Sequence, residues 1–447
     1  MKKRFLLIAS SLLTLTFLPQ LPTKAQQQSA QEYMELGIMQ SRASNYAEAQ
    51  KSFTLVINSS PENATAYFNR GYAKYNLKDH RGAINDFDKA IDLNPKYTEA
   101  YIARGMSKSK QDDNKGAIQD YNRAIELNPL DANAFFSRGV SKVKAENYKG
   151  ALSDFNKSIE IVPDNAPSYI ARGTCKQNLE DYKGSLEDFT KAIEISPKRP
   201  TPHVGRAFSK MKLNDFKGAI ADYSKGLEIN PEDAESLYHR GFCKSQIEDY
   251  SGALADFDKA LTLDQESVGA YYGRGFAKNK LGNTKGAIED YNRAILTGNL
   301  EKIKIVYSGP ITKQILDELR NNVQERLKMA EMSPERSEVY FNRGLAKARL
   351  GDTKQAIEDY NKAIDLNPTY AEAYFTRGMV KSAMGDQRGA VQDCTNAIKL
   401  NPKYAEAYYV RGIIKQALGN TDGCFDLSKS GELGYNQAYN VIRDYCN

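Results

Sequence analysis

Histidine is scarce in this 447-residue chain, and the residues that usually hold metals do not cluster. The three histidines are His80, His203 and His239, and their spacing from one another and from the five cysteines fits no metal-ligand motif. A phosphate-binding glycine loop is also missing, because GNTKG at 282–286 is typical of a turn between helices. We therefore predict no metal, no cofactor and no catalytic residues.

Excess charge and long apolar runs are lacking as well. The net charge is +6, but Lys2, Lys3, Arg4 and Lys24 supply four of these charges, and the first 25 residues contain no acid. The rest is nearly neutral, so we expect no binding to nucleic acid or to an anionic membrane. The apolar stretch at 5–18 is shorter than the roughly 20 residues that span a bilayer, so no membrane insertion of the mature chain is expected.

The first 25 residues nevertheless have the organisation of a secretory signal peptide. The basic start MKKR precedes the apolar stretch, and Thr23-Lys24-Ala25 places small residues at the two positions that the peptidase reads. We predict cleavage after Ala25 and export to the periplasm or the exterior of a bacterium.

From residue 30 onward the sequence repeats with a period of 34 residues. Position 8 of each repeat is nearly always glycine, position 20 is mostly alanine, position 24 is mostly Phe or Tyr, and position 32 is usually proline. Two stretches per repeat, such as AYFNRGYAKYNL and GAINDFDKAIDL, carry apolar residues three and four apart, which predicts a pair of helices that must stack on the next pair. Repeats 1 to 11 begin at residues 30, 64, 98, 132, 166, 200, 234, 268, 337, 371 and 405.

This pattern resembles the tetratricopeptide repeat, over about residues 30 to 447. The resemblance implies an all-α, right-handed solenoid whose first helices line a concave groove, with a protein or peptide as partner. The expected segments are a signal peptide at 1–25, repeats 1–8 at 26–301, a divergent repeat or helical insert at 302–336, repeats 9–11 at 337–433 and a capping helix at 434–447.

The segment 302–336 departs from the repeat pattern. Apolar residues recur at Ile311, Ile315, Leu319, Val323 and Leu327, which predicts a helix. Two interpretations remain open: a divergent repeat within the stack, or a projecting element that contacts a partner.

The cysteines fall into two groups. Cys175 and Cys243 occupy equivalent positions two repeats apart, too distant for a disulfide, and Cys394 falls at a core position, so these three are predicted to be buried thiols. Cys424 and Cys446 lie close together near the C-terminus and are a possible disulfide.

Position 7 is arginine in ten repeats, and position 23 is aspartate in nine of these. In repeat 11, whose turn is one residue shorter, Asp426 takes the equivalent place, whereas repeat 1 lacks both residues. Because antiparallel helices bring these positions face to face, we predict a structural ion pair within each hairpin. An arginine ladder that binds anionic ligands is the alternative. Lysine at position 11 receives no partner and is expected to be solvated. The pairs singled out are Arg70 with Asp86, Arg104 with Asp120, Arg172 with Asp188, and Arg240 with Asp256.

Positions 5 and 9 of the first helices carry an apolar and aromatic series. It forms either packing between successive first helices or a groove that binds a partner, and both can hold in part. We accordingly predict an exported, non-enzymatic scaffold. It is expected to be a monomer or to associate weakly with itself. The alternative is a solenoid that self-assembles through its ends or through 302–336. The groove candidates are Phe68, Tyr72, Phe136, Phe208, Tyr238, Phe242, Tyr272, Phe276, Phe341 and Phe375.

Overall fold

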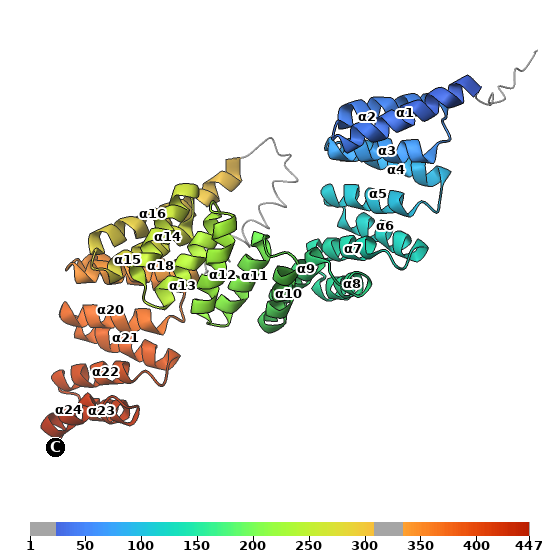
Figure 1. Cartoon of the computed structure of the whole chain (residues 1–447). Helices are drawn as coiled ribbons and strands as arrows, with labels where there is room; N and C mark the ends of the chain where they lie inside the picture. Colours follow the sequence, from blue (N-terminus) through green and yellow to red (C-terminus); the bar gives the residue numbers. More distant parts are fainter. Residues whose placement is uncertain (1–23, 308–333, 447) are drawn as a thin grey trace, which may run out of the picture. The chain divides into compact units, whose positions relative to one another are not determined.

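The structure is a computed structural model that describes residues 24–307 and 334–446. Every regular element in these ranges is an α-helix, and consecutive helices pack in pairs (Figure 1). The chain divides after Pro197 into two compact units, which are described separately. The predicted all-α solenoid of helix-turn-helix repeats is confirmed.

In the first unit, each odd-numbered helix packs against the following even-numbered helix, and each pair packs against the next pair. The helices are α1 (Lys24–Arg42), α2 (Tyr46–Ser59), α3 (Ala64–Asn76), α4 (His80–Leu93), α5 (Thr98–Lys110), α6 (Asn114–Leu127), α7 (Ala132–Lys144), α8 (Tyr148–Ile161), α9 (Ala166–Asn178) and α10 (Tyr182–Ile195).

The second unit continues the same pattern of pairs. Its described helices are α11 (Pro200–Lys212), α12 (Phe216–Ile229), α13 (Ala234–Gln246), α14 (Tyr250–Leu263), α15 (Val268–Lys280), α16 (Thr284–Tyr307), α18 (Pro334–Arg349), α19 (Thr353–Leu366), α20 (Ala371–Ala383), α21 (Gln387–Leu400), α22 (Ala405–Ala417), α23 (Gly423–Glu432) and α24 (Gln437–Tyr445). None of the described helices is both long and apolar enough to cross a membrane.

Two positions set the turn inside each repeat. The residue at position 15 has a positive φ, as in Lys78 with 64° and Gly282 with 86°. The next residue caps the second helix: the Asp79 carboxylate accepts a hydrogen bond from the backbone N–H of Gly82 at 2.9 Å. The left-handed residue reverses the chain and the cap starts the new helix, so the two helices lie side by side.

The contact between the two helices of a repeat depends on a small residue facing an aromatic ring. A Cβ atom on Gly71 would lie 2.8 Å from Cε1 of Phe87, which is too close for two carbon atoms, and Phe87 is fully buried. Ala83 and Ala90 are also fully buried beside this ring. The pattern of small residues at positions 8, 20 and 27 with an aromatic at 24 is therefore the core of each hairpin.

The junction between repeats 8 and 9 is formed by α16 and α18, which pack directly against each other. Val339 and Ala346 of α18 share a buried cluster with Tyr291 of α16. Helix α16 runs past the expected boundary at 301, and α18 begins ahead of 337. The apolar series expected from Ile311 onward lies outside the described residues, so its helix stays a prediction.

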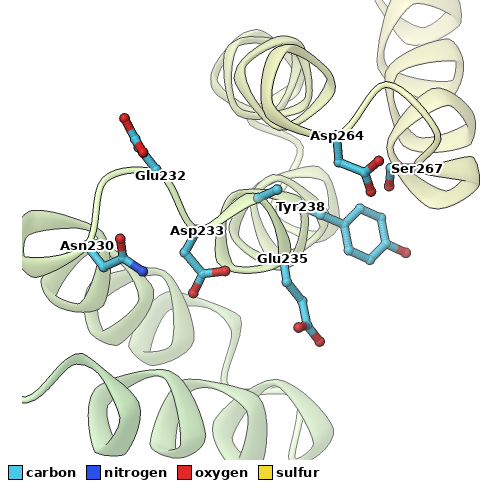
Figure 2. Close-up of a pocket in the computed structure, with 8 residues that line it drawn as sticks. Asn230, Glu232, Asp233, Glu235, Tyr238, Asp264 and Ser267 are labelled. Carbon is cyan, nitrogen blue, oxygen red and sulfur yellow. The ribbon is translucent and has the colours of Figure 1, made fainter. Parts of the chain in front are cut away.

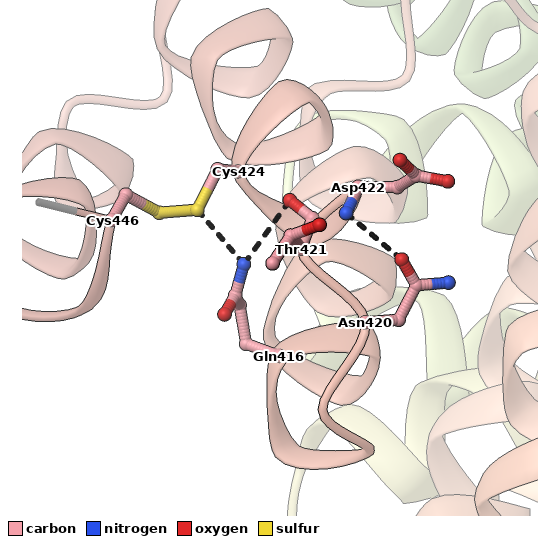
Figure 3. The surroundings of a disulfide bond; sticks show 6 residues. All are labelled: Gln416, Asn420, Thr421, Asp422, Cys424 and Cys446. Carbon is pink, nitrogen blue, oxygen red and sulfur yellow. Dashed lines mark hydrogen bonds between the residues drawn. A yellow bond between two sulfur atoms is a disulfide. The ribbon is translucent and has the colours of Figure 1, made fainter.

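At the C-terminal end, Cys424 of α23 and Cys446 form a disulfide, as Figure 3 shows. The side-chain amide of Gln416 donates to Sγ of Cys424 at 2.8 Å. Helix α24 lies within the segment expected to form a capping helix and packs against α23. Cys175, Cys243 and Cys394 are free and buried.

Candidate partner-binding site

The structure brings together the arginine of position 7 and the aspartate predicted to face it in all ten repeats that carry this arginine. In repeat 7, Nε of Arg240 donates to Oδ2 of Asp256 at 2.9 Å, and Nη2 donates to Oδ1 at 2.6 Å. All ten aspartates are buried. The pairs are Arg70–Asp86, Arg104–Asp120, Arg138–Asp154, Arg172–Asp188, Arg206–Asp222, Arg240–Asp256, Arg274–Asp290, Arg343–Asp359, Arg377–Asp393 and Arg411–Asp426.

The lysine of position 11 has a partner that the sequence did not reveal. Lys244 lies one helical turn after Arg240, and its Nζ is 2.8 Å from Oδ2 of Asp256. Each buried carboxylate therefore binds two cations from the facing helix. The available signal was the spacing of four residues between Arg and Lys, which places both side chains on one helix face.

Within each unit, arginines of position 7 also link their repeat to the preceding one. Nη1 of Arg274 donates to Oδ1 of Asp258 at 2.8 Å, and its guanidinium lies 5.5 Å from the ring centroid of Tyr271. Nη1 of Arg172 likewise donates to the side chain of Asn156 at 2.7 Å. Since Nε, Nη1 and Nη2 of these guanidinium groups are engaged within the protein, the geometry favours the structural interpretation over an anion-binding ladder.

In repeat 6, the ion pair shifts the pKa values of both Arg206 and Asp222. Burial by itself raises the pKa of Asp222, but hydrogen bonds from Arg206 and Lys210 outweigh it and hold that pKa below its usual value. The hydrogen bond to Asp222 raises the pKa of Arg206. The carboxylate of Asp222 is thus kept ionised, as a buried anion with two cationic partners.

The candidate groove residues differ in what they contact. At position 5, the ring centroids of Phe68 and Phe87 lie 5.8 Å apart, and Phe341, which is buried, lies at the same distance from Tyr360. Phe136, Tyr238 and Tyr272 make equivalent ring contacts in their own repeats, and Phe375 stacks near Tyr404. Position 5 therefore contributes largely to the core.

Position 9 is more open to solvent. Phe208 and Phe276 are half-buried, and the ammonium groups of Lys212 and Lys280 each lie 5.4 Å from the centroid of one of these rings. Other apolar side chains at position 9 are exposed over more than a third of their surface. They are Tyr72, Met106, Phe242, Met379 and Ile413.

Four of the candidate residues meet in one pocket of the second unit, which has a volume of about 360 Å³. We call it the apolar pocket. Its polar lining residues include Gln246 and Glu338. The apolar side chains that line it come from α13, α14, α15 and α18 and are Tyr238, Phe242, Phe257, Val268, Tyr272, Phe276 and Val339.

Two glycines of α15 open the apolar pocket. A Cβ atom on Gly273 would lie 2.5 Å from Cζ of Phe257, and one on Gly269 would lie 2.9 Å from the ring of Tyr238. No other repeat has glycine at both of these positions, 2 and 6. The space is therefore a particular feature of α15 and not of the solenoid in general.

Helix α18 closes the other side of the pocket through polar contacts with α15. The Asn342 side-chain amide donates to the Tyr272 hydroxyl at 2.9 Å, and that hydroxyl lies 3.5 Å from Oε2 of Glu338. Burial, together with the negative charge of Glu338, raises the pKa of Tyr272, so its hydroxyl stays protonated.

A second hollow, of about 510 Å³, adjoins the apolar pocket and shares Tyr238 with it (Figure 2). We call it the acidic hollow. Asp233 caps α13 by accepting from the backbone N–H of Ser236, and Asp264 accepts from the backbone N–H of Glu266. In the described part of the chain, no three His, Cys, Asp or Glu residues are grouped to hold a metal ion. The residues that line the hollow are Asn230, Glu232, Asp233, Ala234, Glu235, Tyr238, Asp264 and Ser267.

Comparisons with solved structures return tetratricopeptide repeat proteins. YrrB, described as having an unusual peptide-binding site, is 24% identical, with 41% of this chain and 95% of that chain covered and a TM-score of 0.37. A protein from Parabacteroides merdae is 21% identical over 58% of this chain and 99% of its own, with a TM-score of 0.44. PilF of Pseudomonas aeruginosa is 17% identical, with 46% of this chain and 94% of that chain covered and a TM-score of 0.43.

A search of the curated proteins finds no match. Family models of the tetratricopeptide repeat, in contrast, match along both units and together cover more than half of the chain. The matched ranges are 64–97, 102–166, 166–199, 234–267, 268–296, 337–370 and 359–392. The repeat pattern, the helix pairs and these matches agree, and the chain belongs to the tetratricopeptide repeat family.

Proposed function

We propose that this protein is an exported, non-enzymatic scaffold whose first helices bind a segment of a partner protein. Tetratricopeptide repeats form protein-interaction scaffolds, because stacked repeats create extended binding surfaces. The observation that carries the proposal is the series of exposed apolar side chains at position 9, which includes Tyr72 and Met106 in the first unit and Phe242 and Met379 in the second. Apolar groups left exposed at one equivalent position indicate a surface for a partner.

The buried carboxylates support a non-enzymatic role. A catalytic acid or base needs a carboxylate that is able to exchange a proton with a substrate. The ten aspartates that face the arginines of position 7 are instead buried and held by arginine and lysine. The negative charge of these aspartates is explained by the ion pairs that join the two helices of each hairpin.

The disulfide between Cys424 and Cys446 supports export. Disulfides persist in secreted and periplasmic proteins, whereas the cytosol keeps thiols reduced. This agrees with the predicted signal peptide at 1–25, whose removal would leave Gln26 as the first residue of the mature chain.

The groove proposal is tested by placing a photo-crosslinking amino acid at Tyr72, Met106, Phe242 or Met379 in the native cells. Matched controls place it at Gln119 and Gln392, exposed residues of the second helices α6 and α21. We expect adducts with a shared partner from the position-9 sites, identified by mass spectrometry. Adducts from the second helices alone would show that the partner binds elsewhere.

A further inference from the structure

The apolar pocket and the acidic hollow are neighbours and differ in chemistry. Tyr238 lines both, and Ser267 of the hollow precedes Val268 of the pocket in the chain. The pocket presents aromatic rings, whereas the hollow presents four carboxylates and no basic residue among its lining side chains. A ligand that fits both must therefore combine an apolar group with a positive charge.

Within the hollow, two carboxylates are already committed to the backbone. Asp233 caps α13 and so offsets the positive end of that helix, and Asp264, which follows α14, accepts the N–H of Glu266 in the loop. The negative charge toward solvent then comes chiefly from Glu232 and Glu235, and the side chain of Glu235 is 84% exposed. These two glutamates are the groups that a bound cation would contact.

Basic side chains accompany the apolar pocket instead, because Arg336 is among its lining residues and Lys280 contacts one of its rings. The ammonium group of Lys280 lies 5.4 Å from the ring centroid of Phe276 and 5.9 Å from that of Tyr250. A second cation would be repelled there, while it would be attracted at Glu232 and Glu235. The site is thus polarised, with acidic groups in the hollow and basic groups at the apolar pocket.

We propose that this region, as part of the partner-binding groove proposed above, recognises a segment with an aromatic or long aliphatic side chain beside a lysine or arginine. The apolar side chain enters the pocket between Phe242, Tyr272 and Phe276. The basic side chain lies in the acidic hollow against Glu232 and Glu235. The pocket volume of about 360 Å³ accommodates one large side chain and exists because Gly269 and Gly273 leave it open.

The test uses three fluorescein-labelled peptides in a Gly-Ser background, read by fluorescence polarisation with the mature protein. The Lys-Phe probe has lysines beside a central phenylalanine, the Glu-Phe probe replaces the lysines with glutamates, and the Lys-Ser probe replaces the phenylalanine with serine. We expect the Lys-Phe probe to bind about tenfold more tightly than either of the others. Higher ionic strength should weaken its binding.

Two substitutions with matched controls locate the binding. Phe242→Ala and Glu235→Lys should each weaken the Lys-Phe probe about tenfold. Phe425→Ala changes an exposed aromatic of the second helix α23, and Glu372→Lys changes an exposed glutamate at the same position 2 as Glu235, so neither should weaken it. All four sites are solvent-exposed, and a melting curve for each variant verifies its folding.

Equal binding of the Lys-Phe and Glu-Phe probes would overturn the inference, as would equal effects of the test and control substitutions. Self-association of the wild type that Phe242→Ala abolishes would show that a second copy occupies the pocket instead. If crosslinks form at position 9 while the probes show no selectivity, the proposed function stands and only this inference fails. If the probes behave as expected while no crosslink forms at position 9, the proposed function fails separately.

Discussion

Arg172 of α9 and Asp188 of α10 form a bidentate pair across the seam of repeat 5. Nε of Arg172 donates to Oδ2 at 3.0 Å, and Nη2 donates to Oδ1. Lys176 approaches Oδ2 at 2.9 Å, while the Asp188 side chain is only 3% exposed. One buried carboxylate thus neutralises a cation that also binds Asn156 of the preceding repeat.

We expect Asp188→Ala to lower the free energy of unfolding by about 3 kcal/mol, because it leaves two partly buried cations without their anion. Replacing both Arg172 and Asp188 by apolar residues should recover much of this loss. A double-mutant cycle measured by urea denaturation gives the coupling. The exposed pair of Lys191 and Glu194 is the control, and its loss should change the free energy of unfolding far less. Absence of coupling between Arg172 and Asp188 would contradict the structural role.

The tyrosines at position 24 give a second prediction. The hydroxyls of Tyr223, Tyr291 and Tyr360 are buried without a hydrogen-bond partner among the described residues. Because Phe87 and Phe257 fill the same position in other repeats, we expect Tyr360→Phe to raise the free energy of unfolding by about 1 kcal/mol.

The control for that substitution is Tyr121→Phe. The Tyr121 hydroxyl differs from that of Tyr360 because it is not among the buried groups without a partner and the side chain of Ser141 interacts with it, so its removal should not stabilise the protein. Thermal melting compares the two variants directly. Equal destabilisation by both would mean that the Tyr360 hydroxyl makes a favourable interaction as well.

The ion pairs show how far the sequence could predict contacts. Arg at position 7 and Asp at position 23 appear together and are both missing from repeat 1, so covariation within the chain predicts their contact. The contact of Lys74 and its equivalents with the same aspartate was not predicted, because a lysine one turn after an arginine is equally compatible with a solvent-exposed helix face. The inter-repeat contact was also hidden, since its acceptor varies, as in Asp88, Asn122 and Ser224.

The pocket could be predicted only in part. The spacing placed the aromatic pairs of α13 and α15 on one face, and the pocket contains them. The opening of the pocket depends on Gly269 and Gly273. Its far side is formed by α18, which comes after the segment 302–336 that does not fit the repeat pattern. Because the 34-residue repeat is interrupted at 302–336, the sequence does not reveal that α18 packs directly on α16. Such adjacency is a property of the folded stack.

His239 of α13 provides a pH-dependent prediction. Its ring lies 5.9 Å from that of Tyr223 and 5.0 Å from that of Tyr238. Burial lowers the pKa of His239, and the charge of Glu235, 3.7 Å from Nε2, offsets this only in part. The unfolded chain therefore binds this proton more readily than the folded protein. The corresponding stability is fully present above about pH 6.5, the ordinary histidine pKa, and is lost as the pH falls below it.

The measurement compares melting temperatures at about pH 7.5 and about pH 5.5 for the wild type and for His239→Gln. The wild type should lose more stability on acidification than the variant does. His80 and His203 are present in both proteins, so their contributions cancel in the comparison. An identical decline in the two proteins would exclude His239 as a source of the pH dependence.

The disulfide gives the last prediction, because it joins Cys424 of α23 to Cys446, which follows α24. The bond closes a loop with a sequence separation of 22, so Cys446→Ser should lower the stability of this end by about 3 kcal/mol. Since each repeat contacts mainly its neighbours, hydrogen exchange should show lost protection in α23 and α24 while α3 and α4 remain unchanged. Cys243→Ser is the matched control: this free cysteine occupies the position filled by Ser107 and Ser141 in other repeats. If exchange in α24 is the same with and without the bond, α24 is held by its packing alone.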